Sequence, residues 1–190
     1  LAQVDENRKP IPGTEEEYTC DTLLLSVGLI PENELSDKLG VRLHPVTGGP
    51  VVNESLETSI TGVFVCGNVL HVHDLVDFVS QEASMAGNCA AAFVKKGRTE
   101  ETAEVLVKCG TGVRYTVPAK IRPAYMEEKL PVRFRVGAVY QRASIVVRSG
   151  DTVLLRKKRP VMAPGEMETV YIKKDALLSD ERTEEITISI

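Results

Sequence analysis

The chain of 190 residues lacks tryptophan, and aromatic side chains make up only 5% of it. No apolar run approaches the ~18 residues that a membrane-spanning helix needs, and no signal-peptide pattern is present. The four cysteines, Cys20, Cys66, Cys89 and Cys109, are too scattered for a metal site. Cys66 and Cys89 lie in apolar stretches. We therefore expect buried, reduced thiols in a cytoplasmic protein that does not enter a membrane, in preference to disulfides.

The net charge of -4 is unevenly divided along the chain. Residues 1–97 carry 6 Lys+Arg and 14 Asp+Glu, whereas residues 98–190 carry 17 and 13. Such a change of composition predicts a boundary at Gly97, with one domain at 1–97 and a second at 98–190. An acidic protein with a single short basic run and no interleaved aromatic residues is not expected to bind nucleic acid.

The stretch from Thr58 to Gly87 predicts the main binding site. Its apolar run Val63–Val65 is typical of a strand buried on both faces of a parallel sheet. Gly67 follows it, and the residues from Asp74 to Lys96 predict a helix that stops at Gly97. A buried strand, a glycine turn and a helix start aimed back at that turn favour binding of a phosphate or another electron-rich group.

The spacing Thr-x-x-x-Gly-Val-Phe-x-x-Gly-Asn, from Thr58 to Asn68, resembles the second flavin-binding motif of the FAD-dependent pyridine nucleotide-disulfide oxidoreductases. The stretch Cys20–Pro31 is similar to the apolar strand and the Gly28 turn by which that family's chain returns to its FAD domain. The segment Ala83–Ala92 is similar to its small-residue helix closing the flavin site. The resemblance implies that residues 1–97 are the C-terminal part of a Rossmann-like FAD/NAD(P)-binding domain, with FAD as cofactor and NAD(P)H as co-substrate.

The resemblance also implies a set of cofactor-binding residues. Gly67, Asn68 and Val69 would reach the ribityl chain of FAD, with Asn68 in place of the family's usual Asp. Backbone N–H groups of Asp74, Leu75 and Val76 would face the pyrimidine edge of the flavin. A carboxylate there would oppose the negative charge of a reduced flavin, so we expect Asp74 to cap the helix instead.

Other hallmarks of this family are missing from the sequence. It contains no G-x-G-x-x-G loop for a pyrophosphate and no C-x-x-C or C-x4-C redox pair, and it begins at Leu1 without Met. We therefore expect the C-terminal piece of a longer enzyme, whose first partner is the upstream part of the same polypeptide. By itself the piece is expected to bind FAD poorly and to be inactive, and we assign it no catalytic residue.

His71 and His73 leave three interpretations open. On an extended segment both imidazoles share a face and could bind one metal ion, but the sequence shows no close third ligand apart from Asp74. They could instead act as acid or base beside the flavin, or belong to a loop packed over its ring. The last interpretation is favoured, and no metal ligand is assigned.

His44, in a predicted hairpin over Val41–Val52, is expected to be a surface residue. A short helix is predicted over Asn33–Leu39.

Residues 98–190 predict an all-β domain after a polar linker at 98–104. Short segments of alternating polarity are separated by turn residues, which is typical of half-buried antiparallel strands. They are Val105–Lys108, Val113–Val117, Val132–Val136, Ser144–Val147, Val153–Arg156, Thr169–Ile172 and Ile186–Ile190. This number of strands favours an immunoglobulin-like β-sandwich, with a small barrel as the alternative.

Two functions follow from these patterns. The first is a flavoprotein oxidoreductase that moves electrons between NAD(P)H, FAD and an unidentified acceptor. The alternative is a non-catalytic β-sandwich module that docks the flavoprotein to an electron-acceptor protein or to a second copy of itself. The basic run Arg156–Arg159 motivates the alternative, because it could bind an acidic partner or the acidic first half; it could also merely prevent edge pairing of a strand.

Overall fold

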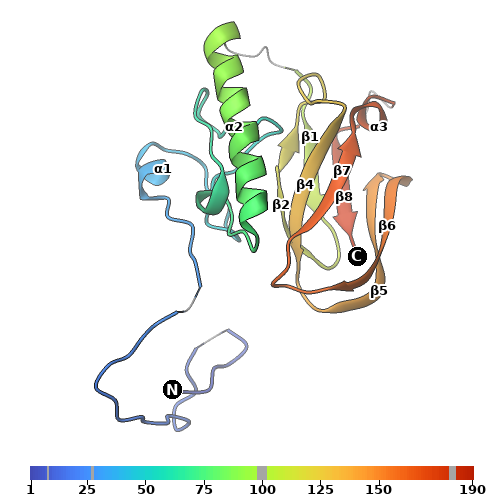
Figure 1. The fold of residues 1–190 in the computed structure, drawn as a ribbon. Helices are drawn as coiled ribbons and strands as arrows, with labels where there is room; N and C mark the ends of the chain where they lie inside the picture. The colour runs from blue at the N-terminus through green and yellow to red at the C-terminus, as the bar shows by residue number, and fades with distance from the viewer. Residues whose placement is uncertain (8, 27, 98–101, 180–182) are drawn as a thin grey trace.

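The computed structural model describes residues 1–7, 9–26, 28–97, 102–179 and 183–190. Within these ranges the chain is a mixed α/β protein with its long helix in the first half and its strands in the second (Figure 1). Val27 of the predicted strand and residues 98–101 of the predicted linker lie outside the described residues. No helix in the described part of the chain has the length and apolar composition needed to cross a bilayer.

The first half is built from loops around helix α2, Val76–Lys96. The predicted helix is thus confirmed, and Gly97 ends it with a positive φ of 81°. A short helix, α1 at Glu34–Lys38, and a 3-10 turn, η1 at Gly67–Val69, precede it. The hairpin predicted over Val41–Val52 is also present, as the bridge between Leu43 and Pro50 shows.

The predicted parallel strands of the first half are wrong. Residues 20–26 form no strand (Figure 1). Leu23, Leu24 and Leu25 are 71%, 89% and 75% exposed. Val63–Val65 is only half-buried and forms a single bridge, from Phe64 to Glu57. A parallel strand needs neighbours to hydrogen-bond on its edges, and the described residues of 1–97 contain no strand that could serve as one.

The second half contains every strand that the alternating pattern predicted, plus a short one. The strands are β1 Val105–Cys109, β2 Val113–Val117, β3 Lys120–Ile121, β4 Lys129–Val136, β5 Tyr140–Ser149, β6 Thr152–Met162, β7 Glu168–Lys173 and β8 Glu185–Ser189, with helix α3 at Lys174–Leu178. In the described residues they form two sheets, ordered β3-β1-β8-β5-β6 and β2-β4-β7.

One apolar core joins the two sheets. Phe134 and Val132 of β4 and Ile145 and Ile188 of β5 and β8 are fully buried in it. The strand pairs are antiparallel except that β1 runs parallel to β8, a pairing that the antiparallel prediction did not include. The immunoglobulin-like type and the domain boundary at Gly97 stay predictions.

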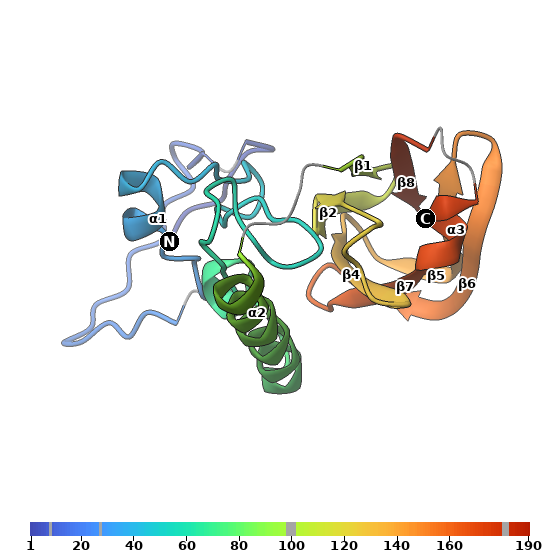
Figure 2. The same ribbon diagram turned by 90° about the horizontal axis from the view of Figure 1, so that it is seen from above.

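The two halves pack against each other along β2 and β4 (Figure 2). A second apolar cluster contains residues of both halves: Val52, Leu56, Leu70 and Ala86 with Tyr115 and Val117. The backbone N–H of Ala119 donates to the carbonyl of Val52 at 3.1 Å. The start of α2 and the loop before it are therefore held against the sheet that contains β4.

Candidate functional site

The turn η1 carries the first group of predicted cofactor residues. Gly67 is buried and has a positive φ of 72°, which favours glycine. Its N–H donates to Glu82 Oε1 on α2 at 2.6 Å, and its carbonyl accepts from the N–H groups of Leu70 and His71. Gly67 therefore connects η1 to α2 through a hydrogen bond.

Asn68 and Val69 lie on the surface of this turn. Asn68 is exposed, and its Oδ1 accepts the N–H of His73 at 3.1 Å. Val69 is 39% exposed, and its carbonyl accepts from Nδ2 of Asn33 at 2.8 Å. Asn33 is the N-cap residue of α1, but its side chain makes no capping bond and ties that helix to η1 instead.

The second group lies at the start of α2. Leu75 is the N-cap residue, and Leu75 and Val76 are 55% and 74% exposed. The prediction that Asp74 caps the helix is wrong, since no side chain caps α2. Asp74 pairs instead with Arg135 of β4 at 3.6 Å, and its Oδ2 accepts the N–H of Met167 at 3.2 Å. Both oxygens are used by the second half of the chain.

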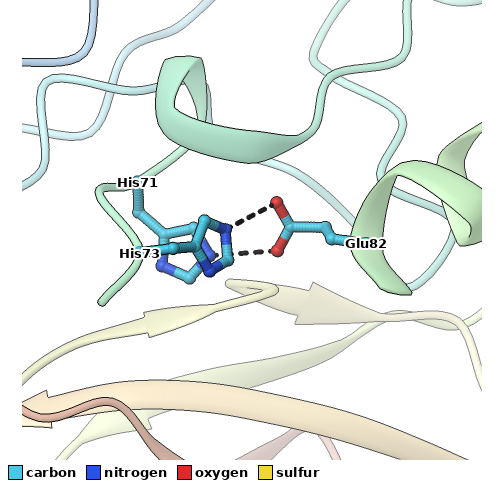
Figure 3. A group of neighbouring side chains, drawn as sticks. All are labelled: His71, His73 and Glu82. Carbon is cyan, nitrogen blue, oxygen red and sulfur yellow. Dashed lines mark hydrogen bonds and ion pairs between the residues drawn. The ribbon is translucent and has the colours of Figure 1, made fainter. Parts of the chain in front are cut away.

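A buried cluster of His71, His73 and Glu82 connects the two groups (Figure 3). Nε2 of His71 lies 3.0 Å from Glu82 Oε2, and Nε2 of His73 lies 3.1 Å from Glu82 Oε1. The two imidazole rings are 4.4 Å apart and lie edge to face. The predicted sharing of one face by the two histidines is confirmed, and their common partner is a glutamate of α2.

The charges in this cluster are fixed by burial and hydrogen bonding. Burial alone would raise the pKa of Glu82, but hydrogen bonds from His71 and His73 outweigh it and lower the pKa to about 2. Burial lowers the pKa of His71 despite its bond to Glu82, so its imidazole is neutral near pH 7. Glu82 is therefore a carboxylate, and Arg133 of β4, 3.7 Å away, is the cation that faces it.

The three side chains have ligand atoms within 4.8 Å of one another, as a metal site requires. Metal-bound histidines almost always donate their second ring nitrogen to an acceptor, but Nδ1 of His71 and of His73 has no partner in the described structure. Arg133 also already compensates the one carboxylate of the cluster. The arrangement therefore fits a charge-assisted hydrogen-bond network better than a metal site.

A cavity of about 390 Å³ opens beside this network. Gly28 and Leu29 of the predicted turn line one part of it, and His71 and Val72 line another. Arg114 of β2 and Arg135 complete it from the second half. The cavity thus brings together the Gly28 turn, the loop before α2 and two arginines. A further cavity of about 420 Å³ lies near Cys89 and Phe93, toward the other end of α2.

The cysteines are all free thiols, as predicted, but they are not all buried. Cys20 and Cys109 are exposed, while Cys66 and Cys89 are intermediate. Burial raises the pKa of the Cys66 and Cys89 thiols, which keeps them protonated at neutral pH.

Comparison with known proteins finds a family match in the first half. Residues 2–91 match the family of pyridine nucleotide-disulphide oxidoreductases. The match supports a fragment of a pyridine nucleotide-disulphide oxidoreductase in the first half of the chain. Over 60 residues, 32% of the chain, the sequence is also 35% identical to the NAD(P)H sulfur oxidoreductase (CoA-dependent) of Pyrococcus abyssi (strain GE5 / Orsay). The chain spans 13% of that protein's length. No solved structure matches the chain.

Two site residues were not predicted from the sequence: Glu82, within the matched residues 2–91, and Arg135, on β4 of the second half. Glu82 lies nine residues after His73, and only the second turn of α2 brings it back to the histidines. The sequence feature that could have identified Glu82 is its position as a charged residue on the otherwise apolar face of α2. Arg135 stands in the alternating pattern of β4, where an arginine is expected to face solvent, and gave no signal of its contact with Asp74.

Proposed function

We propose that the chain is the C-terminal part of a flavoprotein oxidoreductase that is reduced by NAD(P)H and passes electrons to a further acceptor. The observation that carries this proposal is the family match over residues 2–91, which includes η1 and the start of α2. Bound FAD would supply the redox chemistry, and this chain would supply positioning and electrostatics. The first half would then be the C-terminal part of a Rossmann-like domain.

The exposed residues around η1 fit one edge of a flavin. Asn68 presents an amide that can hydrogen-bond a ribityl hydroxyl, on a turn whose positive φ is supplied by the buried Gly67. Leu75 and Val76 expose apolar surface beside the first N–H groups of α2, where the helix favours negative charge. The cavity lined by Gly28 and Val72 lies on the same loop system.

The partner that best fits the first half is the upstream part of the same polypeptide. Leu24 and Leu25 are 89% and 75% exposed, and Ile30 is 87% exposed. Such an apolar run is typical of a parallel-sheet strand that lacks its neighbours. An upstream segment that supplies those neighbours and the pyrophosphate loop would cover this surface and complete the cofactor site.

The test is flavin binding by the full-length polypeptide that contains this chain. We expect it to purify with one FAD, whose absorbance near 450 nm is bleached by NADH or NADPH, and we expect residues 1–190 alone to retain none. Asn68→Ala should weaken FAD binding, whereas Asn88→Ala, an exposed asparagine further along α2, should not. A full-length protein without flavin and with no response to either nucleotide would overturn the proposal.

The docking alternative also has an observation in its favour. The basic run lies on β6, at the edge of its sheet, where Arg156 and Lys158 are exposed. Arg159 pairs with Glu168 of β7, and Lys157 donates to the carbonyl of Thr169, so the run serves the second half itself rather than the acidic first half. Arg156→Glu with Lys158→Glu should weaken binding to an acceptor protein or to a second copy, and unchanged association would reject this surface.

A further inference from the structure

Strand β4 directs two arginines at the segment that joins η1 to α2. Arg133 and Arg135 are two residues apart and therefore lie on the same face of the strand, opposite the core residue Phe134. Arg133 faces Glu82, while Arg135 reaches the loop itself. The second half of the chain thus supplies the cations that face this loop and helix.

Arg135 holds the loop by several contacts. Its Nη2 donates to the carbonyl of Val72 at 3.0 Å and lies 3.6 Å from Asp74 Oδ1. Its Nη1 donates to the carbonyl of Pro164 at 3.2 Å, which anchors the guanidinium to the second half. The side chain of Arg135 is 14% exposed and that of Asp74 is 27% exposed, so the pair is only weakly screened by solvent.

These contacts also fix where the negative charge of Asp74 points. Oδ1 faces Arg135, and Oδ2 accepts the N–H of Met167. The carboxylate is therefore drawn toward the β sheets and away from the uncapped first turn of α2. Without Arg135, it would be free to occupy that turn, because helix N-termini attract carboxylates.

We propose that Arg135 is a positioning residue of the flavin site, which keeps the Asp74 carboxylate neutralised and away from the flavin edge at the start of α2. The inference rests on the proposed function, and it gives the β domain an intramolecular role in that function. Reduction adds negative charge to the flavin, and an uncompensated carboxylate nearby opposes it. Arg135 therefore makes the flavin easier to reduce.

The experiment measures the midpoint potential of the flavin bound to the full-length polypeptide. Arg135→Gln should lower the equilibrium constant for reduction by about threefold or more, about 14 mV for a two-electron couple. Arg135→Lys should restore part of the loss, because it keeps the charge but not the fork of donors. Adding Asp74→Asn to Arg135→Gln should return the potential to the wild-type value or above it.

Arg114→Gln is the matched control. Arg114 lines the same cavity from β2 but forms no ion pair within the described residues, so its loss removes a positive charge without releasing a carboxylate. A shift for Arg135→Gln no larger than for Arg114→Gln would overturn the proposal. So would an equal shift for Arg135→Gln with and without Asp74→Asn.

A second measurement does not depend on flavin. In the flavin-free protein, Arg135→Gln should speed hydrogen exchange of the Met167 amide and of residues 72–78 at least threefold, and Arg114→Gln should not. If the full-length protein binds no flavin, the proposed function fails, but hydrogen exchange still tests whether Arg135 holds the loop before α2. Unchanged exchange in Arg135→Gln would show that Arg135 does not hold this loop, whether or not flavin binds.

Discussion

The single residue on which the site depends most is Glu82, a fully buried carboxylate that accepts from a backbone N–H and from two imidazoles. Glu82→Gln keeps the shape of the side chain but removes its charge, leaving Arg133 without its partner. Because breaking a buried charge network is strongly destabilising, we expect a loss of about 3 kcal/mol in the free energy of unfolding. Urea denaturation followed by circular dichroism measures it.

A surface carboxylate provides the comparison. Glu185 lies 4.0 Å from Lys108, and both side chains are more than half exposed. Glu185→Gln should therefore change the free energy of unfolding by less than about 0.5 kcal/mol. Similar losses for the two variants would show that the buried network contributes no more than an exposed ion pair.

The same glutamate predicts a pH dependence of stability. The pKa of Glu82 is lowered from its ordinary 4.5 to about 2, so its stabilising contribution is present above pH 4.5 and is lost as the pH falls from there toward 2. The lowered pKa of His71 acts in the same direction, because the unfolded chain binds its proton already below pH 6.5. We expect the melting temperature to fall steadily on acidification below about pH 6.5.

Glu82→Gln separates the two contributions. The variant should lose less stability than the wild type between pH 4.5 and 3, because its side chain takes up no proton there. Differential scanning calorimetry from pH 3 to 8 gives both curves. Parallel curves below pH 4.5 would mean that Glu82 titrates as it does in the unfolded chain.

At the scale of elements, the hairpin over residues 41–52 touches the loop after η1 at Gly49. A Cβ on Gly49 would lie 1.7 Å from the carbonyl oxygen of Leu70, which leaves no room for any side chain. Gly49→Ala must therefore push the hairpin and η1 apart, and we expect it to cost about 3 kcal/mol. Gly87, on α2, has open space around its Cβ position, so Gly87→Ala should instead stabilise the protein by up to about 1 kcal/mol.

Thermal unfolding of these two glycine variants tests the contact. Gly49→Ala should also increase hydrogen exchange of the Asn68 and Val69 amides, since it displaces the turn that carries them. A tolerated Gly49→Ala, with exchange like that of Gly87→Ala, would show that the hairpin does not hold η1.

The elements that the sequence predicted well are those with local causes. Helix α2 has alanine-rich turns, two terminal lysines and Gly97 as its stop, and all of these act within a few residues. The strands of the second half follow from alternation, as in β2 at Val113–Val117. The apolar run at residues 20–26 failed because a parallel strand depends on neighbours that are distant in sequence, and no local feature supplies them.

Only the local geometry of the candidate site could be predicted. The turn at Gly67 and Asn68 follows from a glycine after an apolar run, and the proximity of His71 and His73 follows from their spacing. Cofactor binding by Gly67 and Asn68 stays a prediction. Asp74 was misassigned, since its partners Arg135 and Met167 are far away in the sequence. Contacts between halves of a chain are set by tertiary packing, and no period or motif in either half encodes them.

At the scale of the whole molecule, opposite charges join the two halves. Glu54 of the first half is nearly fully buried and accepts from the backbone N–H and from Nη2 of Arg122, both at 2.8 Å. In this contact and in the pairs Asp74–Arg135 and Glu82–Arg133, a carboxylate of the acidic first half faces an arginine of the basic second half. Buried pairs of this kind couple the stabilities of the parts they join.

We therefore expect the halves to unfold together and Glu54→Gln to separate them. Ellipticity at 222 nm follows mainly α2, and tyrosine fluorescence follows mainly the second half, because Tyr115, Tyr125, Tyr140 and Tyr171 all lie there. The two signals should give one urea midpoint in the wild type and two in Glu54→Gln, with α2 melting first. Glu104→Gln, which removes an exposed carboxylate that pairs with Lys120 within the second half, should keep a single midpoint. Two midpoints already in the wild type would mean that the arginines of β4 do not hold α2 in place. A single midpoint in Glu54→Gln would mean that the apolar cluster around Leu70 joins the halves without help from the Glu54–Arg122 pair.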